Sequence, residues 1–196
     1  MAIPRSPKRV EKGSVLGIAK SRDCGLHSVK VGEVEGVNET KNRPLFETTV
    51  PSYLTAWPSR DLIRAGHQQI TREWWQNRRG LFEVFISQLV LDEASAGDSA
   101  AARDRLAVVQ ELPLLDITDE VTSLAAALVA SLALPSKAAI DAAHIALATV
   151  HETHFLLTWN CSHIANAEMA VAIERVCAEN GFTCPVICTP EALMGG

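Results

Sequence analysis

The sequence predicts an α/β domain with a mainly parallel five-stranded sheet flanked by helices, and three observations lead to this class. From Pro44 onward, short apolar runs alternate with segments that carry apolar side chains at helical spacing. Strands that alternate with helical segments of about 10–15 residues pair in parallel through crossover connections. The chain has 196 residues, of which 47% are hydrophobic, so it can bury the core of one domain of ordinary size.

Five short apolar runs are the predicted strands, each bounded by polar residues or turn formers. They lie near residues 45–49, 82–86, 112–117, 155–158 and 185–188. The first run extends from Leu45 to Val50. We expect Pro51 to end it as a strand, because proline lacks the N–H group that a sheet needs.

The predicted helices are marked by capping and stop signals at their ends. Ser87 is expected to cap a helix that continues to about Ala96, with Gly97 closing it. Thr118 is expected to open an Ala-rich helix, and Pro135-Ser136 to start the next one. Further helices are expected within residues 59–79, from Ala101 to Gln110, and from Ala167 to Glu179, where Asn180-Gly181 closes the last of them.

Charge is unevenly divided along the chain, whose net charge is −5. Residues 1–43 hold nine Lys and Arg against five Asp and Glu and show no apolar period. We expect them to form a flexible or non-native N-terminal extension, or alternatively a short partner-binding segment. Residues 44–196, the predicted domain, hold nine Lys and Arg against eighteen Asp and Glu. So acidic a body disfavours bulk, non-specific binding of nucleic acid, but a nuclease site must itself be acidic to hold metal.

The sequence lacks the patterns that are typical of several classes of protein, which disfavours those classes. No run approaches the roughly 18 apolar residues of a membrane span, and the basic N-terminus lacks the apolar stretch of a signal peptide. A cytoplasmic protein with no membrane partner is therefore expected. The five cysteines show no zinc-ribbon spacing and are expected to be reduced and mostly buried. Neither a Gly-x-Ser-x-Gly elbow nor a GxGxxG or Walker A pattern occurs, which disfavours serine hydrolases and nucleotide-cofactor enzymes.

Polar residues stand at the ends of the predicted strands. Glu47 comes at the end of the first strand, Glu93 lies on the helix after the second, and Asn160 and His163 follow the fourth. Asp141 lies at the start of the helix that precedes the fourth strand. Because sites in open α/β sheets form beyond the carboxyl ends of the strands, we expect these side chains to converge.

The surroundings of Asp141 point to a metal. It lies among small residues, in the stretch Ile140-Asp141-Ala142-Ala143, where an acid would be costly to bury without a cation or several donors. Hard oxygen ligands favour Mg²⁺ or Mn²⁺. Such ions can activate a water molecule and stabilise charge on a phosphodiester. The pattern therefore favours a metal-dependent enzyme that acts on phosphodiester bonds.

Five stretches, in a fixed order, carry a resemblance to a known family. They are FETTVPSYL at 46–54, ISQLVLDE at 86–93 with Gly97-Asp98, DAAHIA at 141–146, LLTWNCSH at 156–163 and PVICTPEAL at 185–193. With them, residues 44–196 resemble PIN-domain proteins, in particular the VapC-type toxins of type II toxin–antitoxin systems. The resemblance implies a Rossmann-like PIN domain and a Mg²⁺- or Mn²⁺-dependent endoribonuclease that cleaves RNA. It also implies a homodimer and a small cognate antitoxin protein as partner.

The resemblance also assigns roles by position. Glu47, Glu93 and Asp141 take the places of the family's three acids, with Glu47 and Asp141 as metal ligands, and Asn160 matches a polar position. His163 takes the place of a fourth acid, so all five are the expected catalytic residues. Glu47 stands where Asp is more usual, and His163 removes a negative charge, which weakens Mg²⁺ binding and favours Mn²⁺. The alternative function is a catalytically weak or inactive PIN-like RNA-binding or regulatory protein.

Arginine and tryptophan side chains gather between residues 57 and 79, and this combination suits single-stranded RNA through phosphate pairing and base stacking. They are Trp57, Arg60, Arg64, Arg72, Trp74, Trp75, Arg78 and Arg79. The alternatives are a solvated helix face whose tryptophans pack on the core or on a dimer partner, and a groove that receives an antitoxin helix. The expected substrate-binding residues are Thr48, Ser52 and Arg60.

Overall fold

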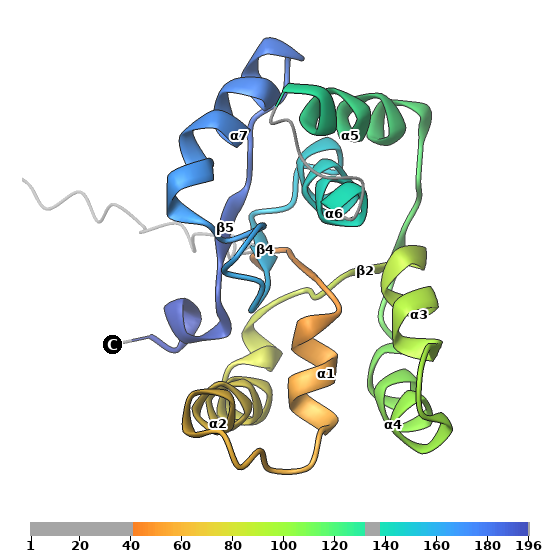
Figure 1. Ribbon diagram of the computed structural model, residues 1–196, viewed down its shortest axis with the longest axis vertical. Coiled ribbons are helices and arrows are strands. Elements are labelled where there is room, and N and C mark those ends of the chain that lie inside the picture. Colours follow the sequence, from red (N-terminus) through yellow and green to blue (C-terminus); the bar gives the residue numbers. More distant parts are fainter. Residues whose placement is uncertain (1–40, 132–137, 196) are drawn as a thin grey trace, which may run out of the picture. The chain divides into compact units, whose positions relative to one another are not determined.

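Strands and helices alternate along the chain in the structure, a computed structural model that describes residues 41–131 and 138–195 (Figure 1). The expected helix start at Pro135-Ser136 lies outside the described residues, as does nearly all of the expected N-terminal extension, residues 1–43. Strand β1 begins at Pro44, the first residue of the domain that the sequence predicts over residues 44–196.

All strand pairs of the two sheets are parallel, as the sequence predicts. One sheet has the order β1-β4-β5 and is formed by β1 (Pro44–Phe46), β4 (Phe155–Leu157) and β5 (Val186–Cys188). The other pairs β2 (Ile86–Ser87) with β3 (Leu114–Leu115). The chain is therefore a mixed α/β protein with parallel pairing.

The prediction of one five-stranded sheet is wrong. Within residues 41–131 and 138–195, the backbone pairing between the two sheets consists of isolated bridges, in which Phe82 pairs with Asn42 and Phe85 with Leu45. The N–H of Phe46 donates to the carbonyl of Phe85 at 3.0 Å, and the N–H of Phe85 donates to the carbonyl of Pro44 at 2.9 Å. Because no two consecutive residues of the run 82–86 pair with β1, the contact does not develop into a continuous ladder.

The helices lie close to where the sequence predicts them. Gly97 and Gly181 have φ angles of 86° and 84°, a left-handed conformation that favours glycine, and they follow helix ends as expected. Asp98 begins the next helix earlier than expected, because its carboxylate accepts from the N–H groups of Ala100 and Ala101. The bounds are α1 (Thr49–Thr55), α2 (Leu62–Asn77), η1 (Arg79–Leu81), α3 (Gln88–Ser95), α4 (Ser99–Val109), α5 (Asp119–Ser131), α6 (Ala139–Val150), α7 (Ala167–Glu179) and η3 (Pro190–Leu193).

The first strand is shorter than predicted, and Pro51 does not end it. Strand β1 stops at Phe46, and the chain enters α1 at Thr49, so Pro51 lies in the first turn of that helix. Proline is tolerated there because the N–H groups of a first turn have no partner within the helix. The consequence is that Glu47 stands at a junction between a strand and a helix, where its backbone direction is held by both.

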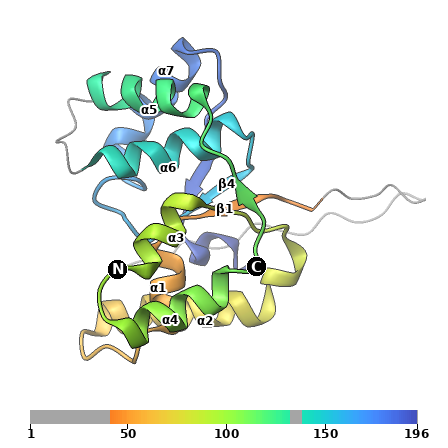
Figure 2. The ribbon, with the colours of Figure 1, turned by 90° about the vertical axis from the view of Figure 1, so that its right-hand side faces the viewer.

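The core is built on both faces of the strands. Side chains alternate along β1 and β4, so Leu45 and Leu156 belong to one buried cluster, and Phe46 and Leu157 belong to the other. The first cluster is completed by α5, α6 and α7, and the second by residues of α1 to α4 that include Trp74. Figure 2 shows the two groups of helices on opposite sides of β1 and β4. Because helices cover both faces of this parallel sheet, both sides of each strand are buried, and the strands therefore read as continuous apolar runs.

The described cysteines match only in part the prediction that they are reduced and mostly buried. Cys161, Cys177, Cys184 and Cys188 are all free thiols. Cys177 is buried and two others are half-buried, but Cys161 is exposed, because it lies in the turn that follows β4 and not in a packed element. Among the described helices, none is both long and apolar enough to cross a membrane.

A pair of matched substitutions tests how α7 is oriented. Val176 is 1% exposed and Val171 is 74% exposed on the same helix. We expect Val176→Ala to lower the free energy of unfolding by about 2 kcal/mol, because methyl groups leave a packed core and a cavity remains. The same change at Val171 should alter it by less than about 0.5 kcal/mol. Urea denaturation measures both, and equal losses would contradict this orientation.

Candidate metal centre

The pairing of β1 with β4 brings two polar segments together. Phe46 pairs with Leu157, and the N–H of Glu47 donates to the carbonyl of Leu157 at 3.0 Å. The residues that follow these two strands therefore leave the sheet side by side. They begin with Glu47 and Thr158, respectively.

Glu47 is 5% exposed and is held through one carboxylate oxygen. Its Oε2 accepts from the N–H of Thr49 at 3.1 Å, from the Thr49 hydroxyl, and from the Thr158 hydroxyl at 2.8 Å. The N–H of Trp159 donates to the same Thr49 hydroxyl at 2.8 Å. Within the described chain, Oε1 of Glu47 makes no hydrogen bond, so three donors orient the carboxylate and leave one oxygen available.

Glu93 is half-buried on α3 and is held in the same manner. Its Oε2 accepts from the Thr48 hydroxyl and lies 3.0 Å from Nε2 of His144 on α6. The hydrogen bond with His144 is the main cause that lowers the pKa of Glu93, against an opposing effect of burial. Thr48, one of the expected substrate-binding residues, thus has its hydroxyl directed to Glu93.

His144 is a site residue to which the sequence analysis assigned no role. Its side chain is fully buried, and it lies three residues after Asp141, so both side chains project from the same face of α6. The i, i+3 spacing of Asp141 and His144 within the stretch DAAHIA is the signal that points to it.

One ligand atom each from Glu47, Glu93 and His144 lies within 4.8 Å of the other two. In the part of the chain that the structure describes, no Lys or Arg forms an ion pair with these acids. Carboxylate oxygens gathered without a balancing Lys or Arg are a donor set that fits a divalent metal ion. The structure thus brings Glu47 and Glu93 together as expected.

Asp141 lies beside Glu47, Glu93 and His144, but it is not one of the three residues whose ligand atoms lie within 4.8 Å of one another. Its pKa is raised, first by burial, while the His163 imidazole lowers it and the charges of Glu47 and Glu93 raise it further. The Asp141 carboxylate is thus close enough to interact electrostatically with both glutamates. Burial is the main cause of the raised pKa, and the charges of the two glutamates act in the same direction, as expected of acids that lie near one another.

Asn160 and His163 adjoin Asp141. The amide of Asn160 donates from Nδ2 to Oδ1 of Asp141 at 3.1 Å, and its own oxygen accepts from the backbone N–H of His163 at 3.2 Å. Asn160 therefore orients Asp141, while the exposed imidazole of His163 lies close enough to lower the pKa of Asp141.

The expected substrate-binding residues do not gather as a group. Ser52 lies with Trp57 and Arg105 in a groove of about 230 Å³ between α1 and α4. Arg60 is exposed on the segment between α1 and α2. Trp74 is fully buried, which supports core packing over RNA stacking for that residue.

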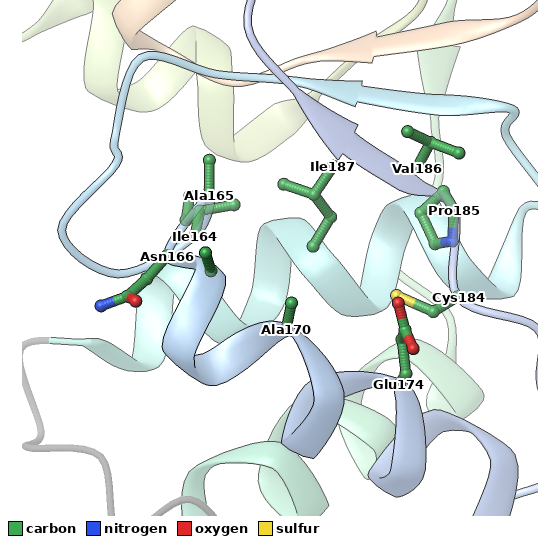
Figure 3. Close-up of a pocket in the computed structure, with 10 residues that line it drawn as sticks. Ile164, Ala165, Asn166, Ala170, Glu174, Cys184, Pro185, Val186 and Ile187 are labelled. Atoms are coloured by element: carbon green, nitrogen blue, oxygen red, sulfur yellow. The ribbon is translucent and has the colours of Figure 1, made fainter.

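A second hollow, of about 370 Å³, lies between α7 and β5. Figure 3 shows this second hollow, with Ile187 and Cys184 on one side and Ala170 and Glu174 on the other. None of the candidate catalytic residues lines either hollow. The candidate metal centre is therefore defined by its converging side chains and not by a large cavity.

Comparisons with known proteins give no match to this chain, either among models of protein families or among curated proteins.

Asp141→Asn tests whether the ionised carboxylate of Asp141 lowers stability, through its burial and through the charges of Glu47 and Glu93. The raised pKa of Asp141 means that folding disfavours its ionised form, so stability is lost as pH rises from the ordinary aspartate pKa through the raised one. At neutral pH in a metal chelator, the variant should melt at the same temperature as the wild type or higher. Below the ordinary aspartate pKa, where both side chains are uncharged, this difference should vanish.

Asp104→Asn, on an exposed position of α4, is the matched control and should leave the melting temperature unchanged at both pH values. A lower melting temperature for Asp141→Asn in chelator at neutral pH would show that its carboxylate is stabilised by contacts that outweigh the repulsion.

Proposed function

We propose that this protein is a metal-dependent endoribonuclease with a Rossmann-like PIN domain, acting in the cytoplasm as the toxin of a toxin–antitoxin pair. The observation that carries the proposal is the convergence of Glu47, Glu93 and His144 within 4.8 Å, with Asp141 beside them. The PIN-domain resemblance supports it, because the same three acids were assigned by position.

Glu47, Glu93 and Asp141 are the residues that would hold the metal, which we propose to be Mg²⁺ or Mn²⁺. Both glutamates have an oxygen with no hydrogen bond among the described residues, and burial and the charges of the glutamates disfavour the ionised form of Asp141. A bound divalent ion supplies an activated water and stabilisation of charge on the phosphodiester.

The chain itself supplies orientation. Thr49 and Thr158 hold Glu47, Thr48 and His144 hold Glu93, and Asn160 holds Asp141. Hydroxyl and amide donors fix a carboxylate without cancelling its charge, as Lys or Arg would do. The acids can thus stay anionic and still keep fixed positions relative to one another.

Several exposed side chains suit an RNA substrate. Trp57 is 91% exposed and can stack on a base, and the exposed Arg60 can pair with a phosphate. The exposed imidazole of His163 lies next to Asp141 and can donate to a phosphate oxygen. These positions support RNA as the polymer that the site acts on.

A PIN-like protein that binds RNA without cleaving it is the second candidate. Two residues favour it: Glu47, which is longer than the aspartate usual in the family, and His163, which replaces an acid. Cleavage of RNA decides between the two functions.

We expect the wild-type protein to cleave single-stranded RNA with Mn²⁺ or Mg²⁺ and to lose this activity in a chelator. Asp141→Asn should lower the cleavage rate by on the order of 100-fold or more, because a metal ligand is lost from the transition state. Asp104→Asn should cleave like the wild type. Gel analysis of labelled RNA measures the rates, and thermal melting with each metal should show a rise, since the ion binds the folded protein.

The nuclease proposal would be contradicted if Asp141→Asn cleaved RNA at the wild-type rate and if neither Mg²⁺ nor Mn²⁺ changed the melting temperature. Metal-independent binding of the same RNA without cleavage would then favour the second candidate.

A homodimer is proposed from the same resemblance, and exposed apolar side chains support it. Trp57, in the segment before α2, is 91% exposed, and Leu62 and Ile63, at the start of α2, are 87% and 73% exposed. We expect light scattering at roughly tens of micromolar protein to give the mass of a dimer. Replacing Leu62 and Ile63 together by Ser should give a monomer, whereas Val171→Ser on α7 should not; a monomeric wild type would contradict the proposal.

A further inference from the structure

His144 meets Glu93 in a geometry that allows two different roles. Its Nε2 lies 3.0 Å from Oε2 of Glu93, and its side chain is fully buried. The imidazole could use the lone pair of Nε2 to bind the metal directly. It could instead carry a hydrogen on Nε2 and donate it to Glu93.

The other ring nitrogen distinguishes the two roles. Nδ1 of His144 is buried and has no hydrogen-bond partner among the described residues. If Nε2 bound a metal, Nδ1 would carry the hydrogen, and a metal-bound histidine nearly always donates that hydrogen to an acceptor. No such acceptor is present in the described chain, and buried N–H groups without partners are rare.

The contact with Glu93 also favours a hydrogen on Nε2 of His144 over a metal bound there. An Nε2 lone pair would face the lone pairs of a carboxylate oxygen at hydrogen-bond distance, which is repulsive, whereas an N–H group at that place is attractive. Oε2 of Glu93 also accepts from the Thr48 hydroxyl, so two donors from two elements converge on one oxygen. The other oxygen, Oε1, makes no hydrogen bond within the described chain.

We infer that His144 is a positioning residue: it donates from Nε2 to Glu93 and so directs Oε1 of Glu93 to the metal, without binding the metal itself. The part of this inference that concerns the metal rests on the proposed function. The donation from Nε2 to Glu93 does not, because it belongs to the metal-free protein. The ion is then held by oxygen atoms alone, which is the donor set that suits Mg²⁺ and Mn²⁺.

The first test is nitrogen NMR of the whole protein with isotopically labelled histidine, in chelator and then with Mg²⁺. The signals of His144 are assigned by their loss in His144→Gln. We expect hydrogen on Nε2 and none on Nδ1 in both samples. A hydrogen on Nδ1, or loss of the Nε2 hydrogen when Mg²⁺ is added, would overturn the inference.

The second test measures Mn²⁺ binding by the wild type, His144→Gln and His144→Leu, each checked for folding by circular dichroism. Glutamine can donate from its terminal amide at about the position of Nε2, whereas leucine fills a similar volume with no donor. We expect His144→Gln to bind Mn²⁺ nearly as tightly as the wild type and His144→Leu to bind about 10- to 100-fold more weakly. Equal binding by all three proteins, or equal weakening in both variants, would contradict the positioning role.

The third test is pulsed EPR of bound Mn²⁺, which detects whether a histidine nitrogen binds the metal. With labelled histidine in the wild type, we expect no coupling from a directly bound histidine nitrogen; such a coupling would make His144 a ligand and overturn the inference while leaving the nuclease proposal intact. A wild type that binds neither Mn²⁺ nor Mg²⁺ would overturn the proposed function and the metal part of the inference. In that case the NMR spectrum of the metal-free protein still decides whether His144 donates to Glu93.

Discussion

The parallel register of β1 and β4 is the constraint on which the candidate site depends. Phe46 pairs with Leu157, so Glu47 and Thr158 leave the sheet together and the Thr158 hydroxyl reaches Glu47 at 2.8 Å. A slip by one residue would turn each side chain to the opposite face of its strand. The buried clusters oppose such a slip, because it would exchange the faces on which Leu45 and Phe46 lie.

The short turn after β1 adds a second constraint. Thr49 begins α1, donates to Glu47 through its hydroxyl and its N–H, and accepts from the N–H of Trp159. One residue thereby links the start of a helix, the carboxylate and the segment that follows β4. The position of Glu47 is consequently determined by the sheet and by α1 at once, which limits the freedom that its extra methylene would otherwise give it.

Electrostatics explains why the donors around these acids are mostly uncharged. A buried carboxylate needs hydrogen bonds to offset the loss of water, and Glu47 obtains them from Thr49 and Thr158. An arginine or lysine would offset that cost as well, but it would also cancel the charge that attracts a cation. The raised pKa of Asp141 reflects burial and the charges of Glu47 and Glu93, which these uncharged donors leave in place.

The sequence by itself determined the α/β class, the parallel pairing and the ends of several helices, because those properties are encoded over short distances by apolar period and by capping residues such as Gly97 and Gly181. It also placed Glu47 after the first strand and Glu93 on the helix after the second, as in the structure. It misjudged Pro51, since a proline ends a strand and also begins a helix, and the local sequence does not say which. Only the tertiary structure decided that His144 meets Glu93, 51 residues away, because that contact depends on how α3 and α6 approach each other across the sheet. No local pattern encodes that approach; it follows from the packing of the whole core.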